Sequence, residues 1–133
     1  MSLGLLQHYT IEPADLEATK TFYCEVLGLQ NGHRPPLGFP GYWLYSDGVA
    51  TVHLLGRREP REGIVVRGTE AKFSNTGRFD HIAFAASDVD AVRKQLKSKN
   101  VKYREQIVPQ DGAIQILLHD PDGVHLELNF PAK

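Results

Sequence analysis

The chain has 133 residues, of which 41% are hydrophobic and 23% are charged, and a formal net charge of -1. This length suits one domain with a working core, and the near-neutral charge argues against nucleic acid or an anionic membrane as the partner. The chain has a single cysteine, Cys24, which excludes an internal disulfide. No apolar run reaches the roughly 18 residues of a membrane span, and the first residues lack the order of a signal peptide. We therefore expect a cytoplasmic protein.

The first half of the chain begins with an alternating stretch at residues 5–11, which predicts a strand. Asp15 then suits the N-cap of a helix that Gly28 ends. A short polar segment and a proline-rich loop follow, before an aromatic strand at residues 42–46 and another strand at residues 50–55, joined by a turn. We interpret this half as β-α-β-β-β.

A charged, irregular segment of about residues 57–77 follows, with a short edge strand predicted at residues 63–67. Because so long a loop is unusual inside a small domain, we interpret the segment as the joint between two modules, and as a candidate lid. The modules would be about residues 4–56 and 78–131, within one domain of residues 1–133.

The second half repeats the order of the first. Residues 79–85 alternate as a half-buried strand, and Ser87 with Asp90 predicts the start of a helix. Residues 101–107, 113–119 and 124–130 read as strands, and the Asp-Pro-Asp-Gly sequence before the last of them predicts a turn.

Four polar residues occupy matched places, on the first and last strand of each half. His53 follows His8 by 45 residues, and Glu127 follows His81 by 46. A lone strand histidine is more often a surface residue than a ligand, so the repeat, not any single position, favours a joint site. Imidazoles and a carboxylate are ligands that a divalent transition metal accepts. Two other histidines, His33 and His119, lie next to turns and are interpreted as surface residues.

The chain resembles the vicinal oxygen chelate superfamily, which includes glyoxalase I, extradiol dioxygenases, methylmalonyl-CoA epimerase, and fosfomycin- and bleomycin-resistance proteins. The resemblance rests on Gln-His-Tyr-Thr-Ile (7–11), Phe-Tyr-Cys-Glu-Val-Leu-Gly-Leu (22–29), Phe-Asp-His-Ile-Ala-Phe (79–84) and Asp-Pro-Asp-Gly-Val-His-Leu-Glu-Leu (120–128). It implies an α+β fold in which two tandem βαβββ modules form a curled mixed sheet around a metal-binding cleft. Members often pair as homodimers, so we expect a homodimer that acts on a small molecule.

Within this resemblance, an extradiol-type dioxygenase acting on a catechol-like substrate is our leading hypothesis. That branch implies His8, His81 and Glu127 as metal ligands and His53 as an acid-base group or fourth ligand. The preferred metal would be Fe(II) or Mn(II), with Ni(II) or Zn(II) as alternatives. Glyoxalase I usually has a glutamate at the place of His53. The chain departs from the dioxygenase pattern at Leu117, near the place of a pocket tyrosine, and in having two modules where many dioxygenases have four.

Two alternatives stay open. In a glyoxalase-like or epimerase-like isomerase or lyase, Glu127 would take a proton beside a carbonyl held by the metal. In a protein like those of bleomycin resistance, the cleft would bind a drug without metal. In any of the three, candidate substrate-binding residues are Trp43, Tyr45, Arg34 and His125.

Overall fold

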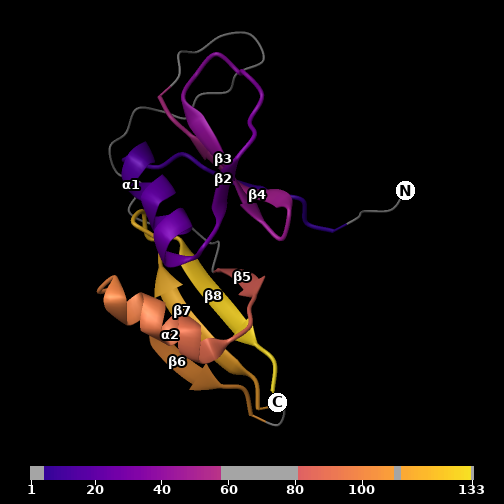
Figure 1. The fold of residues 1–133 in the computed structure, drawn as a ribbon, viewed down its shortest axis with the longest axis vertical. Helices are drawn as coiled ribbons and strands as arrows, with labels where there is room; N and C mark the ends of the chain where they lie inside the picture. Colours follow the sequence, from indigo (N-terminus) through magenta and orange to yellow (C-terminus); the bar gives the residue numbers. More distant parts are fainter. Residues whose placement is uncertain (1–4, 58–80, 110–111, 133) are drawn as a thin grey trace. The chain divides into compact units, whose positions relative to one another are not determined.

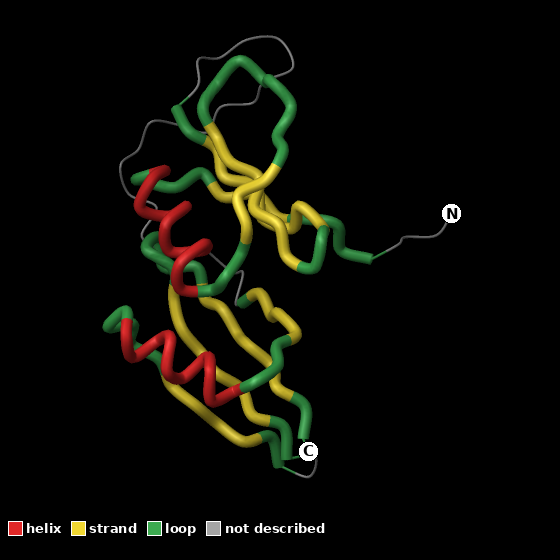
Figure 2. Tube along the Cα trace, in the orientation of Figure 1, coloured by secondary structure: helices red, strands yellow, loops and turns green. Residues whose placement is uncertain are grey.

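The computed structural model describes residues 5–57, 81–109 and 112–132. The chain divides into two compact units, Met1–Phe73 and Ser74–Lys133, and each is described here by itself. Each unit holds helical segments and a four-stranded mixed sheet, which Figure 2 shows in red and yellow. The α+β class with two βαβββ-like modules is therefore confirmed. The predicted edge strand at 63–67 and all but the first residue of the candidate lid lie outside the described residues.

The first unit contains β1 (Tyr9–Ile11), α1 (Leu16–Thr21), a π-helical turn (Phe22–Val26), β2 (Gln30–Gly32), β3 (Gly41–Ser46) and β4 (Val49–Leu55). The strand order is β1-β4-β3-β2, with β1 parallel to β4 and the other pairs antiparallel. Helix α1 packs against β3 and β4. Parallel pairing places the start of β1 beside the middle of β4.

The ends of α1 confirm the predicted signals. Asp15 accepts a hydrogen bond from the backbone N–H of Ala18 at 3.0 Å, so it is the N-cap. The helix then widens into the π-helical turn, and Gly28, with φ of +78°, lies directly beyond it. A left-handed residue at this place is the usual way to end a helix, and glycine adopts it without a steric penalty.

Two strands of the first unit differ from the sequence prediction. Strand β1 has only three residues, so that His8 directly precedes the strand and does not lie on it as predicted, and Leu5 and Leu6 are 98% and 81% exposed. Strand β2 lies in the short polar segment after Gly28, whose polar residues do not alternate and so do not mark the bounds of a strand. Pairing with β3 holds it in place, and the ring of Tyr45 covers Gly32, where a Cβ would lie 2.6 Å from that ring.

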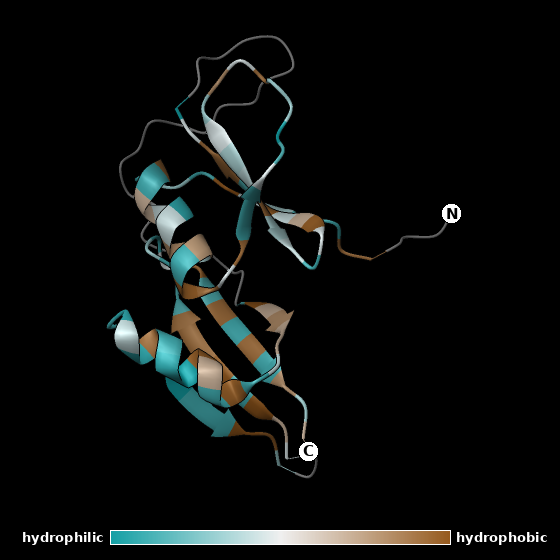
Figure 3. Ribbon diagram, viewed as in Figure 1, coloured by the Kyte–Doolittle hydropathy of each residue, from teal (hydrophilic) through white to brown (hydrophobic). Residues whose placement is uncertain are grey.

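The second unit contains β5 (Ile82–Ala85), α2 (Val89–Ser98), β6 (Arg104–Ile107), β7 (Ile114–His119) and β8 (His125–Phe130), in the order β5-β8-β7-β6. Again the first and last strands are parallel. Helix α2 lies across one face of the sheet (Figure 1). Alternating teal and brown bands along β8 in Figure 3 mark the polar and apolar faces that its sequence predicts. Its apolar face is buried, as are the best covered side chains of this unit, Leu96, Ile116, Leu118 and Leu126.

The start of α2 corrects the predicted cap by one residue. Asp88, with φ of +58°, is the N-cap and accepts from the N–H of Ala91 at 3.2 Å, whereas Asp90 pairs with Arg93. Asp88, and not the predicted Ser87, caps the helix because its side chain reaches the backbone N–H of Ala91, three residues ahead. Among the described residues, no helix is long and apolar enough to cross a membrane.

The predicted turn between β7 and β8 is confirmed. Asp120 is 5% exposed, and its Oδ1 accepts from the N–H groups of Asp122 at 2.8 Å and Val124 at 2.9 Å. A carboxylate that receives two backbone donors replaces the solvation it loses on burial. Asp120 thereby holds the hairpin that carries His119 and His125.

Candidate functional site

In the second unit, His81, which directly precedes β5, meets Glu127 on the paired strand β8. Nε2 of His81 lies 3.1 Å from Oε2 of Glu127. Glu127 is 9% exposed, whereas 40% of the His81 side chain remains exposed. A buried carboxylate is costly unless polar groups surround it, so the pairing with an imidazole stabilises Glu127 at this depth. The two residues predicted to act together from this half do lie together.

The other oxygen of Glu127 is held by a chain of amides that crosses the sheet. Gln115 Nε2 donates to Oε1 of Glu127 at 2.7 Å and lies 3.0 Å from Oδ1 of Asn129. Gln106 Nε2 in turn donates to Oε1 of Gln115 at 2.6 Å. This chain orients the carboxylate, which is the role of outer residues around a metal ligand. Sequence reasoning missed Gln106 and Gln115, because only the strand register places Gln106 beside Gln115 and Gln115 beside Asn129.

In the first unit, three aromatic rings form a stack on the face of the sheet opposite Leu44 and Val52. The ring of His53 lies between those of His8 and Trp43, with centroid distances of 3.9 Å and 4.1 Å and interplanar angles of 9° and 11°. His53 is paired with Trp43 across β3 and β4. The predicted pair of this half, His8 and His53, therefore also lies together, and Trp43 contacts it.

The surroundings of His53 favour its neutral form. Burial, and then the neighbouring His8 and Arg34, hold the pKa of His53 below its ordinary value of 6.5, against an opposing effect of the Ala50 carbonyl. Nε2–H of His53 donates to that carbonyl at 3.1 Å, which leaves Nδ1 with the lone pair. His53 is thus a neutral proton acceptor near pH 7.

The stacked geometry separates the roles of His8 and His53. An imidazole binds a metal through a lone pair in its ring plane, and two nearly parallel planes 3.9 Å apart share no point where one ion could lie. At most one of the two rings can therefore be a ligand in this arrangement. Nδ1 of His8 donates to the amide oxygen of Gln7 at 3.0 Å, so Nε2 of this exposed ring carries the free lone pair. His8 suits a ligand and His53 an acid-base group.

The donor set fits a divalent metal in kind, because each unit presents neutral imidazole or carboxylate groups. Among the described residues, no group of three or more His, Cys, Asp or Glu side chains surrounds a common point. Each unit by itself supplies two of the predicted residues.

The predicted substrate-binding residues of the first unit differ in which of their groups remain available to contact a substrate. Trp43 presents a ring to the histidine stack, whereas the hydroxyl of Tyr45 donates to the carbonyl of His33 at 2.7 Å. The guanidinium of Arg34 lies 5.0 Å from the ring centre of Phe39, and its Nε and Nη2 are buried without a hydrogen-bond partner. Arg34 as a whole is half-buried, and two buried nitrogens without an acceptor among the described residues are unusual, which draws attention to Arg34 as a binding group.

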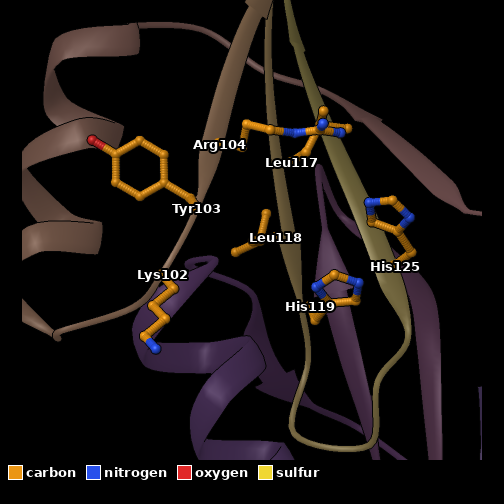
Figure 4. Close-up of a pocket in the computed structure, with 7 residues that line it drawn as sticks. All are labelled: Lys102, Tyr103, Arg104, Leu117, Leu118, His119 and His125. Atoms are coloured by element: carbon orange, nitrogen blue, oxygen red, sulfur yellow. The ribbon is translucent and has the colours of Figure 1, made fainter. Parts of the chain in front are cut away.

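His125, the fourth predicted substrate-binding residue, lines an open pocket of about 270 Å³ in the second unit (Figure 4). Its ring lies 6.1 Å from that of His81, edge to face, and 4.6 Å from that of His119, in a stack. His119 was predicted as a surface residue. It is exposed, but it also lines this pocket beside His125.

Comparison with known proteins relates the whole of both units to one family. Residues 5–128 match the Glyoxalase/Bleomycin resistance protein/Dioxygenase superfamily. Human mitochondrial methylmalonyl-CoA epimerase is 29% identical over 136 residues, which cover 96% of this chain and 74% of that protein. A protein of Synechocystis named as a probable lactoylglutathione lyase is 25% identical over 130 residues, covering 92% of each.

A solved structure agrees at the level of the fold. The crystal structure of lactoylglutathione lyase from Agrobacterium tumefaciens superimposes with a TM-score of 0.69 and 19% identity, covering 98% of this chain and 96% of that one. Since the sequence match extends over nearly the whole chain, the protein belongs to the Glyoxalase/Bleomycin resistance protein/Dioxygenase superfamily.

Proposed function

We propose that this protein is a metal-dependent isomerase or lyase, of the epimerase or glyoxalase kind, that moves a proton at a carbon next to a carbonyl. The observation that carries the proposal is the buried carboxylate of Glu127, held between His81 and Gln115. The names of two relatives, an epimerase and a lactoylglutathione lyase, support it over a dioxygenase.

The metal ligands of this proposal are the three residues that the sequence predicts, in one chain or in a homodimer. His8, His81 and Glu127 would be the ligands, and His53 would become a fourth only if it left the stack with His8 and Trp43. The ion, when bound, supplies a Lewis acid that polarises a substrate carbonyl and makes the neighbouring C–H more acidic. Fe(II), Mn(II), Ni(II) and Zn(II) all accept this donor set.

Proton transfer falls to two groups of the chain. The Glu127 carboxylate takes the proton from carbon, and the Gln115 amide keeps it aligned as its charge is neutralised. His53, whose pKa is lowered by burial, is the second group that accepts or returns a proton. An epimerase needs two such groups, since the proton leaves one face of the carbon and returns to the other.

The substrate would lie against the aromatic and cationic side chains near these groups. Trp43 offers an apolar wall beside His53, and Tyr45 offers only its ring because its hydroxyl is already bonded. Arg34 would meet a substrate carboxylate, and His125 would border the substrate on the side of His81.

An extradiol dioxygenase is the second candidate, and His53 is the observation that favours it. A neutral histidine suits the acid-base role of that branch. Leu117 lies beside Glu127 on the neighbouring strand and offers no hydroxyl at the place of the pocket tyrosine, which favours the first candidate.

One set of assays separates the candidates. Protein purified without chelator is analysed for metal, loaded anaerobically with each of the four ions, and incubated in deuterium oxide with methylmalonyl-CoA and with a glutathione hemithioacetal. We expect deuterium incorporation or isomerisation without oxygen, lost in Glu127→Gln and retained in Glu105→Gln. Oxygen uptake on a catechol panel without exchange would establish the dioxygenase instead. A protein with no affinity for any ion would point to the metal-free drug-binding alternative.

A further inference from the structure

The pocket of the second unit has a cationic rim and an apolar floor. It is lined by Lys102, Tyr103, Arg104, Leu117, Leu118, His119 and His125, which come from the segment leading into β6, from β7 and from β8. No carboxylate lines it. Figure 4 shows His119 and His125 side by side and Arg104 extending across β7 at Leu117, whereas Tyr103 points away from the two imidazoles.

Within the described part of the chain, Lys102 and Arg104 of this pocket form no ion pair. Arg93 pairs with Asp90 and Glu105, and Lys20 pairs with Glu17, but no carboxylate of the described residues pairs with Lys102 or Arg104. Glu105 follows Arg104 directly, and successive strand residues point to opposite faces of the sheet. Glu105 therefore accepts a hydrogen bond from Arg93 on the face opposite Arg104. The charges of Lys102 and Arg104 are therefore available to a ligand.

The two imidazoles add hydrogen-bond donors on the same side. His119 and His125 are cross-strand partners in β7 and β8, and their rings stack at 4.6 Å with an angle of 15°. An imidazole carries at least one N–H, and neither ring is hydrogen-bonded to another described residue. The tight turn at Asp120 fixes both residues at the end of the hairpin.

We propose that this pocket binds the oxyanion of a small organic molecule, either a carboxylate or a phosphate. Guanidinium groups bind both in a bidentate manner, and imidazole N–H groups can add further donors. The Lys102 side chain points away from Arg104 in Figure 4, so it adds positive charge at the edge of the pocket. Leu117 supplies an apolar surface for the carbon atoms next to the anion. His125 is shared with the proposed substrate site, but the assignment is tested on the metal-free protein and does not depend on the proposed reaction.

Titration of the full chain by NMR tests the assignment. The protein is kept metal-free with a chelator, so that phosphate cannot bind through a metal ion, and the ring proton signals of His119 and His125 are assigned with His119→Gln and His125→Gln. Inorganic phosphate and malonate are added at constant ionic strength, with glycerol as the neutral control. We expect saturable shifts with an anion and none with glycerol. The tighter of the two anions identifies the chemistry.

Matched variants decide the role of the cations. The double variant K102Q/R104Q should raise the Kd at least tenfold, whereas K94Q/K97Q, which removes two exposed lysines of α2, should leave it unchanged. K102R/R104K keeps both charges and should still bind, and circular dichroism identifies any variant that fails to fold. Shifts that never saturate, or a Kd that K102Q/R104Q leaves within twofold of the original, would overturn the proposal.

Discussion

Nε2 of His81 and Oε2 of Glu127 lie 3.1 Å apart, although 46 residues separate them in the chain. The parallel pairing of β5 and β8 brings them together, with Ala83 directly beside Glu127. In the first unit, the parallel pairing of β1 and β4 likewise brings His8, which directly precedes β1, against His53, here as stacked rings. Repetition of one strand arrangement thus yields two pairs of chemically useful side chains.

Substitution Glu127→Gln should lower the affinity for divalent metal at least 100-fold. The amide keeps the size of the side chain and its contact with Gln115, but it removes the negative charge that an ion requires. Isothermal titration with Zn(II) and Mn(II) measures the loss. Glu105→Gln is the control, since it removes only an exposed ion pair with Arg93. Equal affinities in the original protein and in Glu127→Gln would remove Glu127 from the ligand set.

Substitution Gln115→Leu should weaken metal binding by roughly 10–100-fold, the range for loss of an outer partner of a ligand. The Nε2 of Gln115 is the donor that holds Oε1 of Glu127 at 2.7 Å, so its loss frees the carboxylate to rotate. Gln106→Leu, one hydrogen bond further away, should have a smaller effect. The same titration compares the two variants, and an equal effect of both would show that the order of the amide chain is unimportant.

The fluorescence of Trp43 should report protonation of His53. Trp43 is the single tryptophan of the chain, and its ring lies 4.1 Å from that of His53. A protonated imidazole quenches an indole in contact with it, so emission should fall with a midpoint below pH 6.5, because burial lowers the pKa of His53. In His53→Gln this transition should disappear. A midpoint above 6.5 would contradict the lowered pKa.

The stability of the protein should depend on the same group. Between the lowered pKa of His53 and 6.5, the unfolded chain binds more protons at this position than the folded one. The contribution of His53 to the free energy of unfolding is therefore complete above pH 6.5 and is lost as the pH falls towards the folded-state pKa. Urea denaturation at pH 7.5 and pH 5 should show a smaller decrease for His53→Gln than for the original protein.

Substitution Asp120→Ala should cost roughly 1–3 kcal/mol of unfolding free energy, because it leaves two backbone N–H groups without their acceptor. Asp120 is 5% exposed and accepts from Asp122 and Val124. Asp120→Asn retains an oxygen acceptor and should cost less. Urea denaturation measures both, and an equal loss in the two variants would assign the effect to the charge of Asp120, not to its hydrogen bonds.

Much of this protein was determined by local sequence. Asp15 and Gly28 predicted the ends of the first helical segment, and the alternation through residues 125–130 predicted the buried apolar face of β8, although Glu127 on the opposite face is buried too. The repeated spacing of His8, His53, His81 and Glu127 predicted two matched pairs, and within each unit the pairing is observed. These features depend on short-range geometry, since side chains alternate along a strand and a cap must lie three residues before the N–H it receives.

Tertiary structure alone decided which atoms meet. Alternation assigns a side chain to a face of the sheet, but not to a neighbour, because the neighbour depends on strand register. Strand register brought Gln115 against Glu127 and stacked His119 on His125. It also brought the rings of His8 and His53 together as parallel planes, so these two histidines cannot bind the same ion in this arrangement. Residues so far apart in the chain come into contact only when the strands pair, and a single sequence does not show at which register they do so.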